Sequence, residues 1–221
     1  MVEPKTKEIG PSFPLFIAAI SGAAILASLV PLFADWLIYD RVEIGQGQIW
    51  RLFTGNLVHF SPNHLFFNLL VFVIVGWTIA NRGYPGFTVF CLLCSGLIGT
   101  VLYGLSPNLA QYGGLSGVAC GTVVYLALFG LAERGVWRAL CASVLLLTVC
   151  KILLEYRLGH FLFATSPDPA FVPMPLSHAV GALTAFIVFL LVRGVRSVAG
   201  ASGNIRSVIR IQTMEPKEEK R

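Results

Sequence analysis

Four polar residues have the types needed for nucleophilic attack on a carbonyl group. Ser116 lies among glycines in the run QYGGLSGVACG, where glycines let the backbone turn tightly and a helix start leaves amide N–H groups free. A nucleophilic serine needs a base, and His178 in the later run SHAVG can be that base. His64 and Asn68 are four residues apart, so both can donate hydrogen bonds from one helix face. Nucleophile, base and oxyanion donors together indicate acyl transfer.

Each of these groups also has a structural interpretation. A serine after glycines serves equally as a helix N-cap. Gly117 and Gly121, one turn apart, would let another helix approach closely. His64 and Asn68 are also typical of hydrogen bonds between membrane helices. The residue types alone leave these alternatives open, so the elements that carry them must decide.

The composition places these residues in a membrane protein. Of 221 residues, 56% are hydrophobic and 12% charged, with a mean hydropathy of +0.76, whereas soluble domains carry about 25% charged residues. A soluble globule of this length could not bury so much apolar surface. Disordered, collagen-like and disulfide-scaffold chains are excluded by the same figures. We therefore expect an all-α, polytopic membrane protein whose partner is the lipid bilayer.

Six apolar stretches predict transmembrane helices. They cover residues 13–34, 64–81, 85–106, 116–132, 137–156 and 176–195. An even number of spans puts both termini on one side of the membrane. Twelve of the sixteen Lys and Arg residues fall on that side and three on the other, while Lys151 lies within a span. The positive-inside rule makes that side cytoplasmic, so the net charge of +5 indicates topology and not nucleic-acid binding.

This topology divides the chain into three parts. Residues 1–12 form a cytoplasmic segment, 13–196 the six-helix domain, and 197–221 a flexible basic cytoplasmic tail. The outward connection 35–60 is long and mixes tryptophan, arginine and glycine with apolar residues. Such a composition favours a structured, partly membrane-embedded first outer loop over a plain linker.

The same topology brings the four polar residues to one depth. The second, fourth and sixth spans all begin at the outer face, and these starts carry His64 with Asn68, Ser116, and His178, respectively. Polar side chains are costly in lipid, so such a coincidence favours a functional site. No acidic residue lies near either Ser116 or His178 in the sequence, and a Ser-His dyad is therefore predicted.

Two charged residues and five cysteines remain inside the spans. Lys151 and Glu155 are four residues apart on the fifth span, which predicts an ion pair along one helix face. A role in binding the polar end of a peptide substrate is the alternative. The cysteines lack the spacing and histidine partners of a metal site, so packing is expected, with no metal and no cofactor.

Several of these motifs together resemble a known family. The runs HFSPNHLFFN, GLSG and HAVG, and the earlier Trp50-Arg51 pair, are similar to the rhomboid intramembrane serine proteases. The similarity covers residues 50 to about 190 in the family's order. The run YGGLSGVACG, the KILLE step from Lys151 to Glu155 and the outer loop before His178 look most like the rhombosortase branch.

The resemblance implies a six-helix rhomboid-like bundle that cleaves peptide bonds within the bilayer. Ser116 would be the nucleophile and His178 the base. The oxyanion would be held by His64, Asn68 and the Ser116 amide. Gly114, Gly117 and Gly181 would shape the site, and His59 would face solvent at its mouth.

The rhombosortase branch further implies a substrate and a compartment. Its members are bacterial enzymes acting on exported proteins with a C-terminal, Gly-Gly-containing transmembrane sorting segment, which suggests the inner membrane. Transfer of the product to an acceptor amine is an open variant of the reaction. In many rhomboids a tyrosine four residues after the serine supports the histidine, but here Cys120 stands there. The alternative is a catalytically inactive rhomboid-like protein that binds transmembrane helices.

Overall fold

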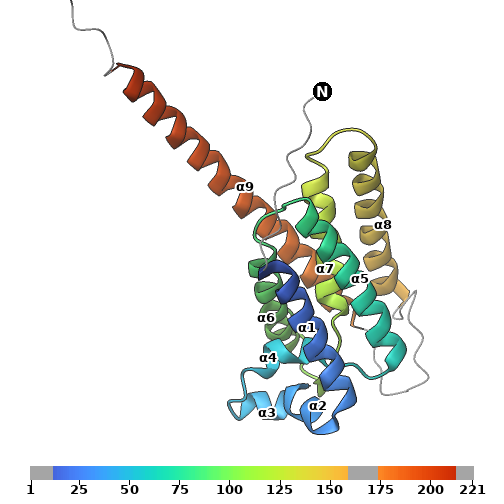
Figure 1. The fold of residues 1–221 in the computed structure, drawn as a ribbon. Coiled ribbons are helices and arrows are strands. Elements are labelled where there is room, and N and C mark those ends of the chain that lie inside the picture. The colour runs from blue at the N-terminus through green and yellow to red at the C-terminus, as the bar shows by residue number, and fades with distance from the viewer. Residues whose placement is uncertain (1–11, 159–173, 213–221) are drawn as a thin grey trace, which may run out of the picture.

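The computed structural model describes residues 12–158 and 174–212 as a bundle of apolar helices (Figure 1). The long helices are α1 (Ser12–Leu29), α5 (Pro62–Asn81), α6 (Phe87–Leu105), α7 (Ser116–Gly130), α8 (Val136–Leu158) and α9 (Pro175–Gln212). The short elements are α2 (Pro31–Leu37), β1 (Tyr39–Asp40), α3 (Arg41–Gly45), α4 (Arg51–Thr54), the 3-10 turn η1 (Gly55–Leu57) and β2 (Gln111–Tyr112). The expected segment 1–12 and the end of the tail lie almost wholly outside the described residues.

Each of the six expected spans contains a helix, but not all are of spanning length. Among the described residues, α5, α6, α8 and α9 are long and apolar enough to cross a membrane. A fifth candidate is α1 combined with α2, and α7 has only 15 residues. The six-span count therefore stays a prediction. The helix α9 continues to Gln212, so the part of the tail that the structure describes is helical.

The first expected span is broken at Pro31. Residues Leu15–Leu29 and Pro31–Leu37 are bent by 115° relative to each other. Proline has no N–H for the helix ladder, and it pushes the preceding residue out of the helical region. Val30 is accordingly extended, with φ −119° and ψ 102°. As a result α2 turns aside at the end of α1, where the first outer loop begins.

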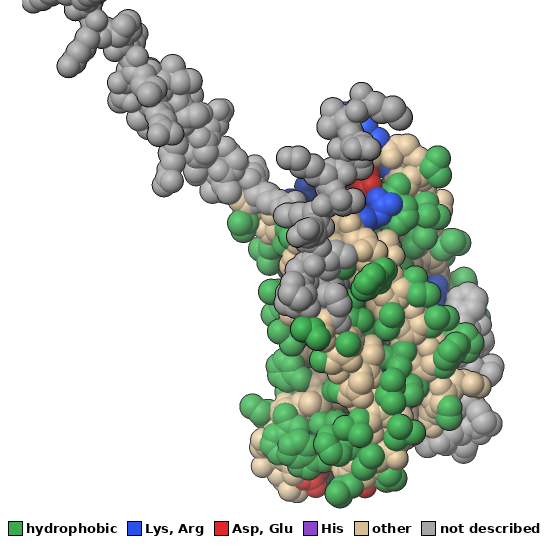
Figure 2. All heavy atoms as spheres, viewed as in Figure 1, with side chains coloured by type: hydrophobic (Ala, Val, Ile, Leu, Met, Phe, Trp, Pro, Cys, Tyr) green, Lys and Arg blue, Asp and Glu red, His purple; other side chains and the backbone are tan. Residues whose placement is uncertain are grey.

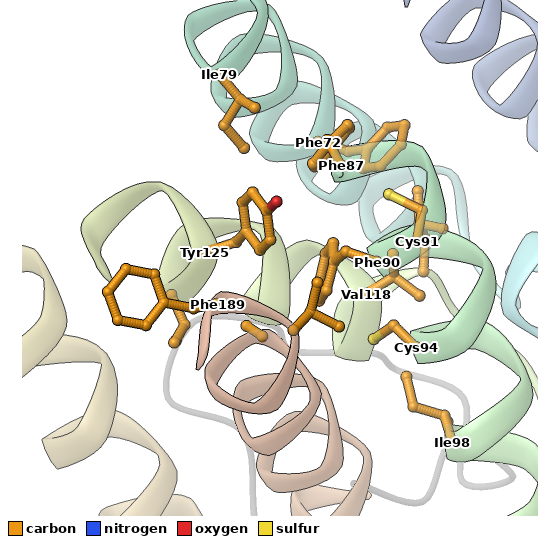
Figure 3. Packing of buried hydrophobic residues seen from close by; sticks show 14 of the residues in the cluster. Phe72, Ile79, Phe87, Phe90, Cys91, Cys94, Ile98, Val118, Tyr125 and Phe189 are labelled. Atoms are coloured by element: carbon orange, nitrogen blue, oxygen red, sulfur yellow. The ribbon is translucent and has the colours of Figure 1, made fainter. Parts of the chain in front are cut away.

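The hydrophobic core forms where α5, α6, α7 and α9 meet (Figure 3). Tyr125 of α7 stacks on Phe90 of α6, with ring centroids 4.9 Å apart. Phe189 of α9 meets Phe129 edge to face. Cys91 and Cys94 also pack in this core as unpaired thiols. The helix α7 is thus enclosed on several sides.

Small residues let α7 and α9 pack at very short range. A Cβ added to Gly181 would lie 2.1 Å from the Gly117 carbonyl oxygen, and one added to Gly121 would lie 2.6 Å from the Gly181 oxygen. Backbones can meet at such distances only where side chains are absent. The close helix approach predicted from Gly117 and Gly121 is therefore confirmed, with α9 as the partner.

The face of the bundle in Figure 2 is mostly apolar along its length, and most of its charged side chains lie toward the two ends. The helix α8 is the most exposed, since only 11% of its spanning window is buried. Exposed side chains such as Leu146, Leu147 and Leu153 cover it. A soluble protein would hide such a surface, so these side chains face lipid.

The first outer loop is structured, as expected. Arg51 is buried and donates hydrogen bonds of 2.8 Å to the carbonyl oxygens of Asp35 and Ile38. Arg41 donates to the Tyr103 carbonyl oxygen at 2.7 Å, which joins the loop to the end of α6. The strands β1 and β2 pair antiparallel. This pairing fixes the loop beside the segment that leads into Ser116.

Candidate active site

The turn that precedes Ser116 is held by two side chains. Gly114 has φ +140°, a conformation in which a residue with a Cβ would be strained. The Tyr112 hydroxyl donates to the Gly114 carbonyl oxygen at 3.0 Å. The Leu115 N–H donates to His59 Nε2 at 3.2 Å. The turn and the helix start that were expected around Ser116 are thus present.

His59 does not face solvent, which corrects the expectation for this residue. It is 9% exposed, and its two ring nitrogens contact the Leu57 carbonyl oxygen and the Leu115 N–H. Accepting from Leu115 requires an unprotonated Nε2, so the proton is on Nδ1, where it is donated to Leu57. Burial, helped by the nearby His64, lowers the pKa of His59 to about 3. His59 is therefore a neutral support of the turn.

Ser116 is the first residue of α7 and remains partly accessible. Leu115 occupies the N-cap position without a side-chain cap, so the N-cap interpretation of Ser116 is wrong. A Cβ on Gly117 would lie 2.9 Å from the Ser177 carbonyl oxygen. The Tyr112 hydroxyl interacts with the side chains of both Ser116 and Ser177. The start of α7 and the start of α9 therefore meet at Ser116.

His178 follows Ser177 and faces a carboxylate. Its Nδ1 lies 2.8 Å from Glu155 Oε2, and the same oxygen accepts from Lys151 Nζ at 2.7 Å. His178 and Glu155 are 3% and 0% exposed. The ion pair predicted between Lys151 and Glu155 is present. The carboxylate beside His178 is a partner that the expected dyad lacked.

The second span brings His64 and Asn68 to the same region. Ser61 caps α5 by accepting from the His64 N–H, and Pro62 occupies the first turn. A Cβ on Gly114 would lie 2.7 Å from His64 Cε1, so this ring lies against the turn before Ser116. The Asn68 amide nitrogen is buried and has no hydrogen-bond partner within the described part of the chain. Asn68 is therefore an unused donor.

A cavity of about 760 Å³ opens beside Ser116 and His64. Its wall includes Tyr112 and Gly113, and Met174, which precedes α9, also lines it. Asp40 and Val42 from the first outer loop line it as well. The cavity therefore lies between the first outer loop and the turn before Ser116.

The sequence of the chain matches a known protein family. The model of the Rhomboid domain matches residues 46–166, more than half of the chain. The chain belongs to the rhomboid family.

Its similarity to characterised rhomboids is partial. It is 32% identical over 99 residues to the rhomboid protease GlpG of Salmonella newport (strain SL254). The corresponding proteins of Salmonella dublin and Salmonella typhi match equally. The match covers 43% of this chain and 34% of each relative. Family membership and the apolar helices make the chain a multi-pass integral membrane protein.

The tyrosine that the resemblance places four residues after the serine is replaced by Cys120 in this chain, which puts the support of His178 in doubt. Cys120 lies one turn after Ser116 on α7, near the charges of Lys151 and Glu155. Glu155 of α8 contacts His178, so this histidine does have a supporting side chain. The described residues hold no metal-binding cluster.

Sequence reasoning missed three features of this rhomboid site. The supporting roles of His59 and Tyr112 were overlooked, although both lie within motifs that carry the resemblance. The contact between Glu155 and His178 was also missed. The available signal was the spacing of Lys151 and Glu155. Side chains four residues apart lie on one face of a helix, so both can meet the same neighbouring helix.

Proposed function

We propose that this rhomboid is an intramembrane serine protease that uses Ser116 as nucleophile and His178 as base. The observation that carries the proposal is the meeting of α7 and α9, where Gly117 lies against Ser177. Ser116 and His178 are the sequence neighbours of these two residues, so the contact supports the proposal that they act on one substrate. A partly accessible serine beside a buried histidine has the arrangement that acyl transfer requires.

The reaction divides into two steps. Ser116 Oγ attacks the carbonyl carbon of the scissile peptide, and its proton moves to His178 Nε2. The carbon–nitrogen bond then breaks, and His178 returns the proton to the leaving amine. In the second step water attacks the acyl ester, gives its proton to His178, and releases the carboxylic acid while Ser116 regains its hydrogen.

The oxyanion formed in each step has three candidate donors. The Asn68 amide nitrogen lacks a partner, and a buried donor without a partner costs about 1–3 kcal/mol. An oxyanion would satisfy it. His64 lines the cavity with Ser116, and the Ser116 amide lies in the first turn of α7, where N–H groups have no helical acceptor. Gly114 and Gly117 keep this space open, and Gly181 keeps α9 close.

The site lies below the membrane surface. At 1.5 Å per residue, the 15 residues of α7 span about 22 Å, which is about 8 Å less than the hydrocarbon thickness of about 30 Å. If Gly130 reaches the inner boundary, Ser116 lies within the outer half of the bilayer. The cavity under the first outer loop then supplies water for hydrolysis.

The proposed substrates are exported proteins with a C-terminal transmembrane segment that contains Gly-Gly, as in rhombosortases. A helix must unwind before its carbonyl carbon can reach Ser116, and glycine costs least to unwind. The resemblance through YGGLSGVACG and the KILLE step supports this branch. The proposed location is the bacterial inner membrane, with both termini cytoplasmic, because the basic residues favour that side.

The experiment that tests the proposal measures cleavage of a model Gly-Gly transmembrane substrate in liposomes. Wild type should cleave, whereas Ser116→Ala and His178→Ala should be inactive. Full activity of Ser116→Ala would overturn the proposal. Mass spectrometry of the new C-terminus separates hydrolysis, which leaves a free carboxylate, from transfer to an amine, which adds the mass of the acceptor.

The second candidate, an inactive protein that binds transmembrane helices, is tested by the same preparation. A fluorophosphonate reacts only with an activated serine. Labelling of wild type but not of Ser116→Ala would exclude the inactive alternative. Capture of the substrate without labelling or cleavage would support it.

A further inference from the structure

The carboxylate of Glu155 is placed where it controls the protonation of His178. Glu155 Oε2 lies 2.8 Å from His178 Nδ1 and 2.7 Å from Lys151 Nζ. One oxygen thus touches two nitrogen atoms, one from α9 and one from the preceding turn of α8. The side chain of Glu155 is 1% exposed, so no bulk water competes for it.

The chemistry of these three groups fixes the direction of each hydrogen bond. An ionised carboxylate only accepts, and a lysine ammonium only donates. Lys151 therefore keeps Glu155 ionised. His178 Nδ1 lies 2.8 Å from the Glu155 oxygen but 3.4 Å from Lys151 Nζ, so the shorter contact decides, and Nδ1 carries a proton that it donates to Glu155. The second ring nitrogen, Nε2, is then unprotonated. That is the tautomer in which Nε2 can remove a proton from a serine.

We propose that Glu155 is a positioning residue that acts through His178, so that the machinery is Ser116–His178–Glu155 and not a dyad. This inference rests on the proposed protease function. Glu155 accepts from Nδ1–H, holds the imidazole in the reactive tautomer, and stabilises the imidazolium formed when Nε2 takes the serine proton. Lys151 balances the buried carboxylate and directs its oxygen toward the ring.

The opposite assignment, in which Lys151 and Glu155 bind the polar end of the substrate, fits the geometry less well. Both side chains are already joined to each other at 2.7 Å. Neither lines the cavity beside Ser116. A substrate group would have to break the ion pair and leave His178 unsupported.

The first test is the variant Glu155→Gln. In wild type one carboxylate oxygen accepts from both Lys151 Nζ and His178 Nδ1, and the amide oxygen of the glutamine can take its place. The reactive tautomer is then kept, but the neutral amide no longer stabilises the imidazolium that forms when Nε2 takes the serine proton. General acid–base catalysis contributes about 10²–10⁴-fold to a rate, and we expect kcat to fall by about 10²-fold with little change in KM.

The second test removes the acceptor as well as the charge. In the double variant Glu155→Leu with Lys151→Met, neither side chain can accept from His178 Nδ1–H, and no buried charge is left unpaired. Replacing a buried ion pair by apolar residues is often neutral for stability, so this variant should fold. We expect its kcat to lie about tenfold below that of Glu155→Gln, since losing a hydrogen bond to a charged group lowers a rate by at least about tenfold. A purely structural role predicts the opposite order, because only Glu155→Gln leaves Lys151 without its anionic partner.

The matched control is Glu133→Gln, which breaks another ion pair. Glu133 joins Arg82 at 2.6 Å, in the turn after α7, at the opposite end of that helix from Ser116. Loss of activity in this variant equal to that of Glu155→Gln would mean that any broken pair disables the protein. That result would overturn the proposal, as would a change in KM alone.

The third measurement is made on wild type, so its result does not depend on whether a Glu155 variant folds. Nitrogen-15 NMR of histidine-labelled protein in lipid reports which ring nitrogen carries the proton, and His178→Gln identifies the signal. A proton on Nδ1 of His178 supports the proposal, and a proton on Nε2 overturns it. If wild type fails to cleave any substrate but shows the Nδ1 proton, the protease function has failed and the Glu155 contact has not.

Discussion

Replacing Gly181 by alanine tests whether the separation of α7 and α9 sets the catalytic rate. The added Cβ would lie 2.1 Å from the Gly117 carbonyl oxygen, whereas ordinary contacts begin at 3.4 Å. The obstacle is backbone and cannot rotate away. The two helices must therefore move apart by about 1.3 Å at this level, three residues along α9 from His178.

The size of the effect follows from that displacement. A misplacement of about 1 Å between reacting groups can lower a rate about 10²-fold, so we expect kcat to fall by about that factor. Overpacking of a core also costs about 1–3 kcal/mol of stability. The change in kcat is measured with the Gly-Gly substrate in liposomes, and the loss of stability is measured by thermal unfolding.

The control for this variant is Gly194→Ala on the same helix. A Cβ at Gly194 meets nothing within 4 Å, so kcat and the unfolding temperature should match wild type. If Gly181→Ala retained kcat within about threefold of wild type, the close approach of α7 and α9 would not be what aligns Ser116 with His178, and the reasoning would be refuted.

Three further predictions concern the supports of the site. The pKa of His59 is lowered to about 3 by burial, so the unfolded chain binds this proton first and stability falls as pH drops from about 6.5 toward 3. In His59→Gln the unfolding temperature should fall less than in wild type as the pH is lowered over this range. An equal fall in the two proteins would contradict the prediction. Arg51→Leu leaves two buried loop carbonyls without their donor, Nη1, which should lower the free energy of unfolding by about 2–4 kcal/mol. Arg51→Lys should recover only part of this loss, because one ammonium can donate to both carbonyls but lacks the second donor, Nε, that binds Gln48 Oε1 at 2.8 Å. Full recovery would show that the bond to Gln48 adds no stability. Tyr112→Phe removes the hydroxyl that holds the turn before Ser116, and kcat should fall about fivefold for a lost hydrogen bond of about 1 kcal/mol; no change in kcat would show that the turn needs no such support.

The positions of the helices were predictable because apolar runs are long and polar breaks are few. The break at Pro31 was also signalled in the sequence, since proline rarely continues a helix. The turning aside of α2 was not signalled, because a membrane-spanning helix can also continue through a proline with only a kink. The helix α7 begins at Ser116, as expected from the glycines before it, and ends at Gly130, two residues before the end of the expected span.

Contacts between distant helices were harder to predict. Glu155 and His178 are 23 residues apart and lie on different helices, so no sequence pattern joins them. His59 looked solvent-facing because it lies in a polar run before Pro62. Its burial depends on a hydrogen bond from the Leu115 N–H, and this donor reaches His59 only when the turn before Ser116 has folded.

The pairing of Lys151 with Glu155 also affects how the chain enters the membrane. A single charge at the centre of a span costs about 2.5–3.5 kcal/mol on insertion scales, but these two lie one turn apart on α8 and neutralise each other within that helix. The pair therefore adds no net charge to the span, and Arg138 and Arg157 lie toward the two ends of α8. His178 lies on α9, so its contact with Glu155 forms only when α9 packs against α8, and assembly of the bundle completes the site.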